Sequence, residues 1–145
     1  MALDATRVIN GTYGTVWHEG NWIMNVKSAE AIVEINKEEI QRSGTRWVGH
    51  KVTSLTGTGS ISMYKVTSEF VQLIGSIADD DGKPYVTELI FKLADPESFG
   101  AERIRLKGVQ FDQIPLGKFE INSIVEDELP FTFSGYELLD KIERA

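Results

Sequence analysis

The residue types that most often carry out chemistry are few in this sequence, and their spacing suits no reaction. Cysteine is absent, which excludes a disulfide framework, a thiolate metal site and a cysteine nucleophile. The two histidines, His18 and His50, have no partners at metal-ligand or triad spacing, so each is interpreted as a surface or half-buried side chain. No nucleophile–base pair or supported carboxylate pair can be nominated, and the sequence predicts a protein that is not an enzyme.

Three short motifs resemble ligand-binding sequences only in part. The run Asp79-Asp80-Asp81-Gly82 departs from the EF-hand pattern, and it and Glu126-Asp127-Glu128 are interpreted as solvated turns. The glycines of Asn10-Gly11-Thr12-Tyr13-Gly14 lack the lysine of a phosphate-binding loop, and Asn10-Gly11 indicates a tight turn instead. We therefore expect no metal and no cofactor.

Composition indicates one globular domain spanning residues 1–145. Hydrophobic residues make up 41% and charged residues 26% of the chain, a balance that can bury a core. The formal net charge of -7 argues against gripping nucleic acid by phosphate neutralisation, although a surface that lets a polyanion pass should itself be negative or neutral. The amino terminus lacks a signal-peptide pattern and no stretch reaches membrane-spanning length, so we expect a soluble chain made in the cytoplasm, with no membrane anchor.

Most segments alternate apolar and polar residues with a period of two, which is typical of antiparallel strands with one wet face. In the segment 85–93, Thr87, Leu89, Phe91 and Leu93 share one face. Strands are expected in the same way around Trp22–Val26, Ala31–Ile35, Val52–Met63, Phe119–Glu126 and Phe131–Phe133.

One amphipathic helix is expected over residues 67–78. Phe70, Leu73, Ile74 and Ile77 follow the spacing of a single apolar stripe, and Thr67 or Ser68 can cap the first turn. A second short helix is expected over residues 136–143. The predicted fold is mainly β, an antiparallel rolled sheet or barrel with one flanking amphipathic α-helix.

The segment from Asn36 to Lys51 has the composition of a contact surface. It is long for a connection between two strands, and long connections in compact domains are usually functional or disordered. We expect it to be disordered in an isolated subunit. The alternative is a solvated loop whose tryptophan folds back onto the core. The candidate contact residues are Lys37, Glu38, Glu39, Arg42, Arg46 and Trp47.

One face of the predicted strand 52–63 carries only small hydroxyl side chains, at Ser54, Thr56, Thr58, Ser60 and Ser62. Such a face suits the wall of a water-filled channel and equally suits the solvent side of an outer strand. A second face, with Arg103, Arg105 and Lys107, places like charges together and requires opposing charge from a neighbouring subunit or from an adjacent strand of the same chain.

Several motifs occur together in a characteristic order along nearly the whole chain. They are Val8-Ile9-Asn10-Gly11-Thr12-Tyr13-Gly14, the stretch from Trp22 through Glu34-Ile35-Asn36-Lys37, the loop ending Arg42-Ser43-Gly44, the strand Gly57-Thr58-Gly59-Ser60 and the helix around Phe70. In this order and spacing the chain resembles the tail tube proteins of PBSX-like prophages and of contractile-tail phages of Gram-positive hosts. None of the motifs carries chemistry.

The resemblance implies a structural subunit that forms hexameric rings, which stack into a hollow tube for DNA passage. The sheets of a ring would join into a continuous inner β-barrel, and residues 36–51 would form the stacking hairpin. Implied partners are further copies of the chain, the tail sheath, the baseplate and the tail terminator, with DNA passing through without specific binding. Implied locations are the host cytoplasm during assembly and then the virion tail. No metal, cofactor or active site is implied.

On this interpretation the channel wall is the face of Ser54, Thr56, Thr58, Ser60 and Ser62, with Glu120 and Glu126 on a neighbouring strand as further candidates. Two alternatives remain open. One is a small ligand-binding β-barrel, which requires a dry apolar cavity. The other is the tube subunit of a tail-like bacteriocin or of a secretion system.

Overall fold

The computed structural model describes residues 2–143, whose strands form one eight-stranded antiparallel sheet with the order β2-β1-β5-β6-β7-β4-β3, while β8 pairs with β6 beside this path. The mainly β fold is confirmed. The strands are β1 (Gly14–His18), β2 (Asn21–Trp22), β3 (Val26–Ile40), β4 (Gly49–Tyr64), β5 (Thr87–Leu93), β6 (Glu102–Phe111), β7 (Glu126–Phe133) and β8 (Gly135–Asp140). One α-helix, α1 (Glu69–Ile74), is joined by the 3₁₀ turns η1 (Ala5–Arg7), η2 (Gly11–Tyr13) and η3 (Gly75–Ala78).

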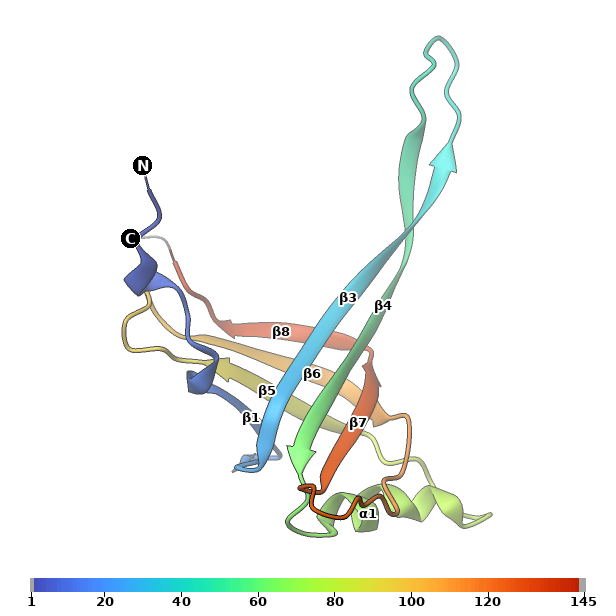
Figure 1. Cartoon of the computed structure of the whole chain (residues 1–145). Coiled ribbons are helices and arrows are strands. Elements are labelled where there is room, and N and C mark those ends of the chain that lie inside the picture. Colours follow the sequence, from blue (N-terminus) through green and yellow to red (C-terminus); the bar gives the residue numbers. More distant parts are fainter. Residues whose placement is uncertain (1, 144–145) are drawn as a thin grey trace.

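The sheet is rolled because β6 belongs to both of its halves. Most of β6 pairs with β5 and β8, whereas its last residues, Gln110 and Phe111, pair with Thr132 and Phe131 of β7. Strands β3 and β4 therefore cross over the layer of β5, β6 and β8 at a steep angle (Figure 1). The core lies between these two layers.

The core is built from the alternating residues that the sequence pattern places on one face. Thr87 and Leu89 of β5 are buried, as are Phe131 and Phe133 of β7, which confirms the predicted faces of both strands. They pack with Ile61, Met63, Leu106, Val109 and Leu129. Complete burial of each large aliphatic or aromatic side chain stabilises the fold by about 1.5–3 kcal/mol.

The predicted helix is present but shorter than expected. Ile74 is buried, and Phe70 packs its ring against His18 and Phe111. Beyond Ile74 the chain tightens into the 3₁₀ turn η3, which has three residues per turn and so rotates later side chains off the apolar stripe. Ile77 is consequently half exposed, and its assignment to the packed face is wrong. None of the helices within residues 2–143 has the length and apolar character to cross a membrane.

Several other sequence-based assignments are wrong. The strand expected over Trp22–Val26 is interrupted by a turn at Met24 and Asn25, between β2 and β3, and Glu126-Asp127-Glu128 begins β7 and does not form a turn. Residues 136–143 do not form a helix, because β8 pairs with β6 and this ladder holds the chain extended. Residues 119–125 do not form a strand. The amide of Ser123 bonds to the carbonyl of Glu120, and Asn122 has a φ of 66°, a left-handed conformation that ends an extended run.

The segment 36–51 is a hairpin rather than a disordered loop. The β3–β4 ladder continues without the support of the core to the pair Ile40↔Gly49, and only residues 41–48 form the connection. Figure 1 shows this two-stranded arm projecting well beyond the rest of the molecule. The expectation of a disordered segment fails because backbone hydrogen bonds between two long strands order it locally.

Candidate functional site

His18 is buried within a cluster of polar side chains, so its interpretation as a surface or half-buried residue is wrong. Its Nε2 atom is 2.9 Å from the Tyr85 hydroxyl and 3.1 Å from the Thr87 hydroxyl. Both hydroxyls also donate to the Glu19 carboxylate, at 3.2 and 3.3 Å. Burial raises the pKa of Tyr85, and the nearby Glu19 carboxylate acts in the same direction.

This cluster is a structural tie between elements. His18 ends β1, Thr87 begins β5, and the His18 ring also contacts Phe70 of α1. Each polar group has its partner, which is what burial of polar side chains requires. His50 lies far along the projecting arm and is exposed. Within residues 2–143, no three His, Asp or Glu side chains gather as a metal site would need.

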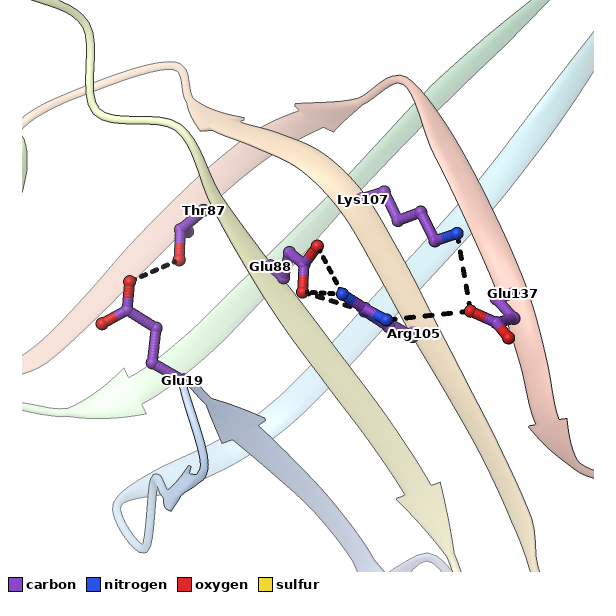
Figure 2. A network of polar contacts seen from close by, with 6 residues as sticks. All are labelled: Glu19, Thr87, Glu88, Arg105, Lys107 and Glu137. Carbon is purple, nitrogen blue, oxygen red and sulfur yellow. Dashed lines mark hydrogen bonds and ion pairs between the residues drawn. The ribbon is translucent and has the colours of Figure 1, made fainter.

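The cationic face of β6 is neutralised within the chain (Figure 2). Arg105 donates to Glu88 of β5 and lies 3.8 Å from the carboxylate of Glu137 on β8, which is also 3.4 Å from Lys107 Nζ. Arg103 pairs with Asp140 of β8. Of the two sources of opposing charge that the sequence left open, the adjacent strands supply it.

The hydroxyl face of β4 points away from the core. Ile61 and Met63, on the opposite face, are buried, whereas Ser54 and Thr56 are exposed and Thr58, Ser60 and Ser62 are half-buried. The strand pairing adds three carboxylates to this face that sequence analysis missed. Glu34 is paired with Thr56, Glu30 with Ser60 and Glu128 with Ser62. Glu30 and Glu34 occupy polar positions in the strand predicted around Ala31 and Val33, and this alternation could have identified them.

The two acidic residues predicted to accompany that face differ from each other in where they lie. Glu120 lies in the turn that ends at Ser123, outside every strand, so its assignment to a neighbouring strand is wrong. Glu126 begins β7 beside Tyr64 and binds Lys27 Nζ at 3.0 Å. The hydrogen bond to Glu126 and the negative charge of its carboxylate raise the pKa of Lys27. The ion pair offsets the negative charge of Glu126.

The projecting arm presents the predicted contact residues together. Lys37, Glu38 and Glu39 lie on β3, and Arg42, Arg46 and Trp47 lie in the connection. Trp47 is 81% exposed, so the alternative in which it folds back onto the core is wrong. The arm thus carries charge of both signs around one large apolar side chain, a composition found at protein–protein contacts.

The sheet is open, and this bears on the ligand-binding alternative. β2 and β3 are the two ends of the strand order, so the described chain is not a closed barrel. A groove of about 630 Å³ runs between β3 and the layer of β1, β5 and β6, and is lined by apolar residues that include Val33, Phe91 and Ile104.

Comparison with known proteins gives consistent matches over almost the whole chain. A family model described as phage tail tube protein matches residues 1–140. The phage-like element PBSX protein XkdM of Bacillus subtilis strain 168 is 37% identical over 145 residues, covering 98% of this chain and 97% of that protein.

Two solved structures share the fold at low sequence identity. The sheath–tube complex of the extracellular contractile injection system PVC in its extended state matches with a TM-score of 0.71 at 12% identity, covering 90% of both chains. The tube-terminating cap of the anti-feeding prophage matches with a TM-score of 0.73 at 12% identity, covering 97% of this chain and 95% of that one.

Proposed function

Because this chain belongs to the phage tail tube protein family and is a structural subunit of a phage-type tail tube, we propose that it closes into hexameric rings that stack into a hollow tube for DNA passage. Residues 1–145 act as a single tail-tube-like domain without catalytic activity. Subunits assemble in the host cytoplasm and function in the virion tail.

The outer edge of β3 is the observation that carries this proposal. β3 is 15 residues long and ends the strand order, so one of its edges has no neighbour within the described chain. A long, unpaired edge invites pairing with another chain, and soluble proteins rarely leave one open. Pairing each β3 with a neighbouring subunit continues the sheet around the ring and satisfies these backbone groups.

The wall of the channel follows from this arrangement. Once the sheets join, the face of β3, β4 and β7 that points away from the core becomes continuous around the ring. It carries the hydroxyls of Ser54, Thr56, Thr58, Ser60 and Ser62 together with Glu30, Glu34 and Glu128. Carboxylates repeated around a ring keep phosphates from adhering to the wall, as charged rings do in ion pores.

The projecting arm is the stacking element between rings. It extends the β3–β4 ladder beyond the core, and it exposes Lys37, Glu38, Glu39, Arg42, Arg46 and Trp47 at its distal end. Its contact with another ring is heterologous and does not close, which yields a filament.

Negative-stain electron microscopy of the purified chain tests the proposal. We expect hollow tubes with a regular axial repeat that form as the protein concentration rises. A chain that stays monomeric over the whole accessible concentration range, with its fold intact by circular dichroism, contradicts the proposed assembly.

A shortened arm tests the stacking role separately. Lys37 and Val52 are paired across the ladder, so residues 38–51 can be replaced by an Asn-Gly turn that closes the hairpin at this pair. We expect a folded protein that forms rings or monomers but no tubes. Normal tubes from this variant would show that stacking uses another surface.

Further partners extend the proposal beyond the tube itself. Structural neighbours come from a sheath–tube complex, a tube-terminating cap and the baseplate of the anti-feeding prophage, and we assign a tail sheath, a baseplate and a tail terminator as partners of this tube. The same neighbours favour a second candidate, the tube of a contractile injection system or tail-like bacteriocin. Particles purified from producing cells decide between them, since only a phage tail joins a DNA-filled head.

A further inference from the structure

We infer that Trp47 of one copy inserts into a pocket at the α1 end of a copy in the neighbouring ring. The inference rests on the proposed stacking of rings and names the surface that receives the arm. Figure 1 shows the tip of the arm and α1 at opposite ends of the molecule, at the top and at the bottom.

The arm holds Trp47 in a defined position. The Trp47 amide donates to the Thr45 hydroxyl at 3.2 Å, and Arg42 Nη2 donates to the Trp47 carbonyl at 3.3 Å. Gly44 turns the chain with a φ of 86°, a conformation that glycine adopts without strain. The backbone on both sides of Trp47 is therefore bonded while the indole itself is 81% exposed.

A pocket of about 520 Å³ lies at the other end, between the β2–β3 turn, the end of β4, α1 and the loop that follows β6. Its apolar lining includes Trp22, Met24, Val66, Phe70 and Pro115. Met24 and Val66 are 75% and 71% exposed. This volume lies within the range of protein pockets that bury a small ligand, so it has room for an indole ring.

An exposed apolar loop continues the pocket surface. The loop leads from Pro115 to β7 and carries four large apolar side chains, each more than three-quarters exposed, at Leu116, Phe119, Ile121 and Ile124. Soluble monomers seldom expose so many neighbouring apolar residues without a partner. The same end of the arm exposes two further apolar side chains, Ile40 and Val48.

Charge complementarity favours a second copy as the occupant. The distal arm, residues 37–51, has more basic than acidic residues although the chain as a whole has a net charge of -7. The α1 end has the opposite balance over residues 67–83 and 112–125. The basic residues of the arm are Lys37, Arg42, Arg46 and Lys51, against Glu38 and Glu39; the acidic residues of the α1 end are Glu69, Asp79, Asp80, Asp81, Asp112 and Glu120, against Lys83 and Lys118.

The geometry suits axial stacking. β4 runs from the arm to the α1 end over 16 residues, which at about 3.3 Å per residue separates the two surfaces by about 50 Å. Two complementary patches this far apart on one chain cannot bind each other within that chain. They instead join successive copies head to tail. Tryptophan and arginine at the centre of such a contact commonly carry much of its binding energy.

Crosslinking tests the contact directly, because the chain contains no cysteine of its own. We compare Val48→Cys/Met24→Cys with the control Val48→Cys/Leu3→Cys, in which Leu3 is 80% exposed at the amino-terminal end. Assembled tubes are treated with a short bis-maleimide and run on denaturing gels. We expect a ladder of covalent oligomers from the Met24 pair and only monomer from the Leu3 pair.

A charge exchange provides a second test that does not depend on crosslinking. We expect Arg46→Glu to raise the protein concentration needed for tube formation at least tenfold, and Arg46→Glu/Glu69→Arg to restore most of it. Trp47→Ala should act like Arg46→Glu, whereas Leu3→Ala should assemble like the parent chain.

The outcomes separate this inference from the proposed function. Tubes that form normally but give no Met24 ladder, an equal ladder from the Leu3 pair, or no effect of Trp47→Ala overturn the inference and leave the tube in place. A parent chain that forms no tubes contradicts the proposed function, and the inference falls with it.

Discussion

The aromatic ring of Phe131 lies against the backbone of Gly59 on the neighbouring strand. A Cβ atom added to Gly59 would be 2.6 Å from the Phe131 Cζ atom and closer still to the carbonyl oxygen of Glu30. Gly57 and Phe133 repeat the relationship two pairs along the ladder. Because the two glycines have no side chains, both rings pack directly on the β4 backbone. The hydroxyl side chains lie on the opposite side of β4 from this aromatic core.

The Gly59→Ala variant should lose stability through overpacking. Neither the Glu30 backbone nor the buried Phe131 ring can move away cheaply, so we expect the free energy of unfolding to fall by about 1–3 kcal/mol. Chemical denaturation measures the change. Gly117→Ala is the matched control, because nothing lies within 4 Å of a Cβ at Gly117. Equal stability of the two variants would show that β4 is not packed this closely.

The docking of α1 depends on Phe70, whose ring contacts His18 and Phe111. Since Phe70 is only partly buried, we expect Phe70→Ala to lower the free energy of unfolding by about 2–3 kcal/mol, less than the 3–5 kcal/mol of a fully buried ring. Ile77→Ala, on the exposed side of η3, should change it by no more than about 0.5 kcal/mol. Thermal unfolding of both variants tests the assignment, and a reversed order contradicts it.

Reversing the charge of Glu137 should destabilise the cationic face of β6. Glu137→Lys would place a third cation beside Arg105 and Lys107. Because these groups are exposed to solvent, the expected loss is about 0.5–1 kcal/mol, and it should shrink as salt screens the repulsion. Unfolding at low and high ionic strength measures both effects. Glu97→Lys, a residue without an ion pair among those the structure describes, is the control and should show no such salt dependence.

Asp95 makes the stability of the amino-terminal segment depend on pH. Backbone amides of Asn10 and Glu97 donate to its carboxylate at 2.8 and 2.9 Å, and these bonds hold the pKa of Asp95 below its ordinary value of 3.8. The folded state therefore binds the proton more weakly than the unfolded state. Its stabilising contribution is complete above about pH 4 and is lost as the pH falls through the lowered folded-state pKa.

The comparison of the parent chain with Asp95→Asn tests this expectation. The difference in melting temperature should be largest near neutral pH. It should diminish below about pH 4, where the Asp95 carboxyl of the unfolded parent chain binds a proton that the folded state binds more weakly. A difference that stays constant over this range would contradict the link between Asp95 ionisation and stability.

Lysines on the proposed channel wall should change how the tube handles DNA. We expect Thr56→Lys/Thr58→Lys to assemble normally and then to retain short duplex DNA at low salt, because cations fixed on the wall bind phosphates. Ala2→Lys/Ala5→Lys adds the same charge at exposed positions of the amino-terminal segment and should not retain DNA. Co-sedimentation of DNA with tubes measures retention. Loss of ring formation in the Thr56/Thr58 variant would instead place that face at a contact between subunits.

Local sequence patterns were sufficient for much of the fold. Alternation identified the buried faces of β5 and β7, and the stripe from Phe70 to Ile74 located α1. These predictions hold because the core selects residues by hydrophobicity alone, and a period of two or of 3.6 determines which residues share a face. Composition alone also excludes whole classes of site, since the chain has no cysteine and a net charge of -7.

Partner strands decided what the patterns could not. Residues 136–140 are extended because β6 offers them a pairing edge, and Glu30, Glu34 and Glu128 join the hydroxyl face only because of how β3 and β7 pair with β4. The sequence predicted a loop in place of the arm because both faces of the arm are exposed to solvent. Its strands therefore show no alternation of apolar and polar residues. Sequence periodicity reports which side chains meet a core, whereas strand pairing is made by backbone groups that every residue has, so only the tertiary structure determines it.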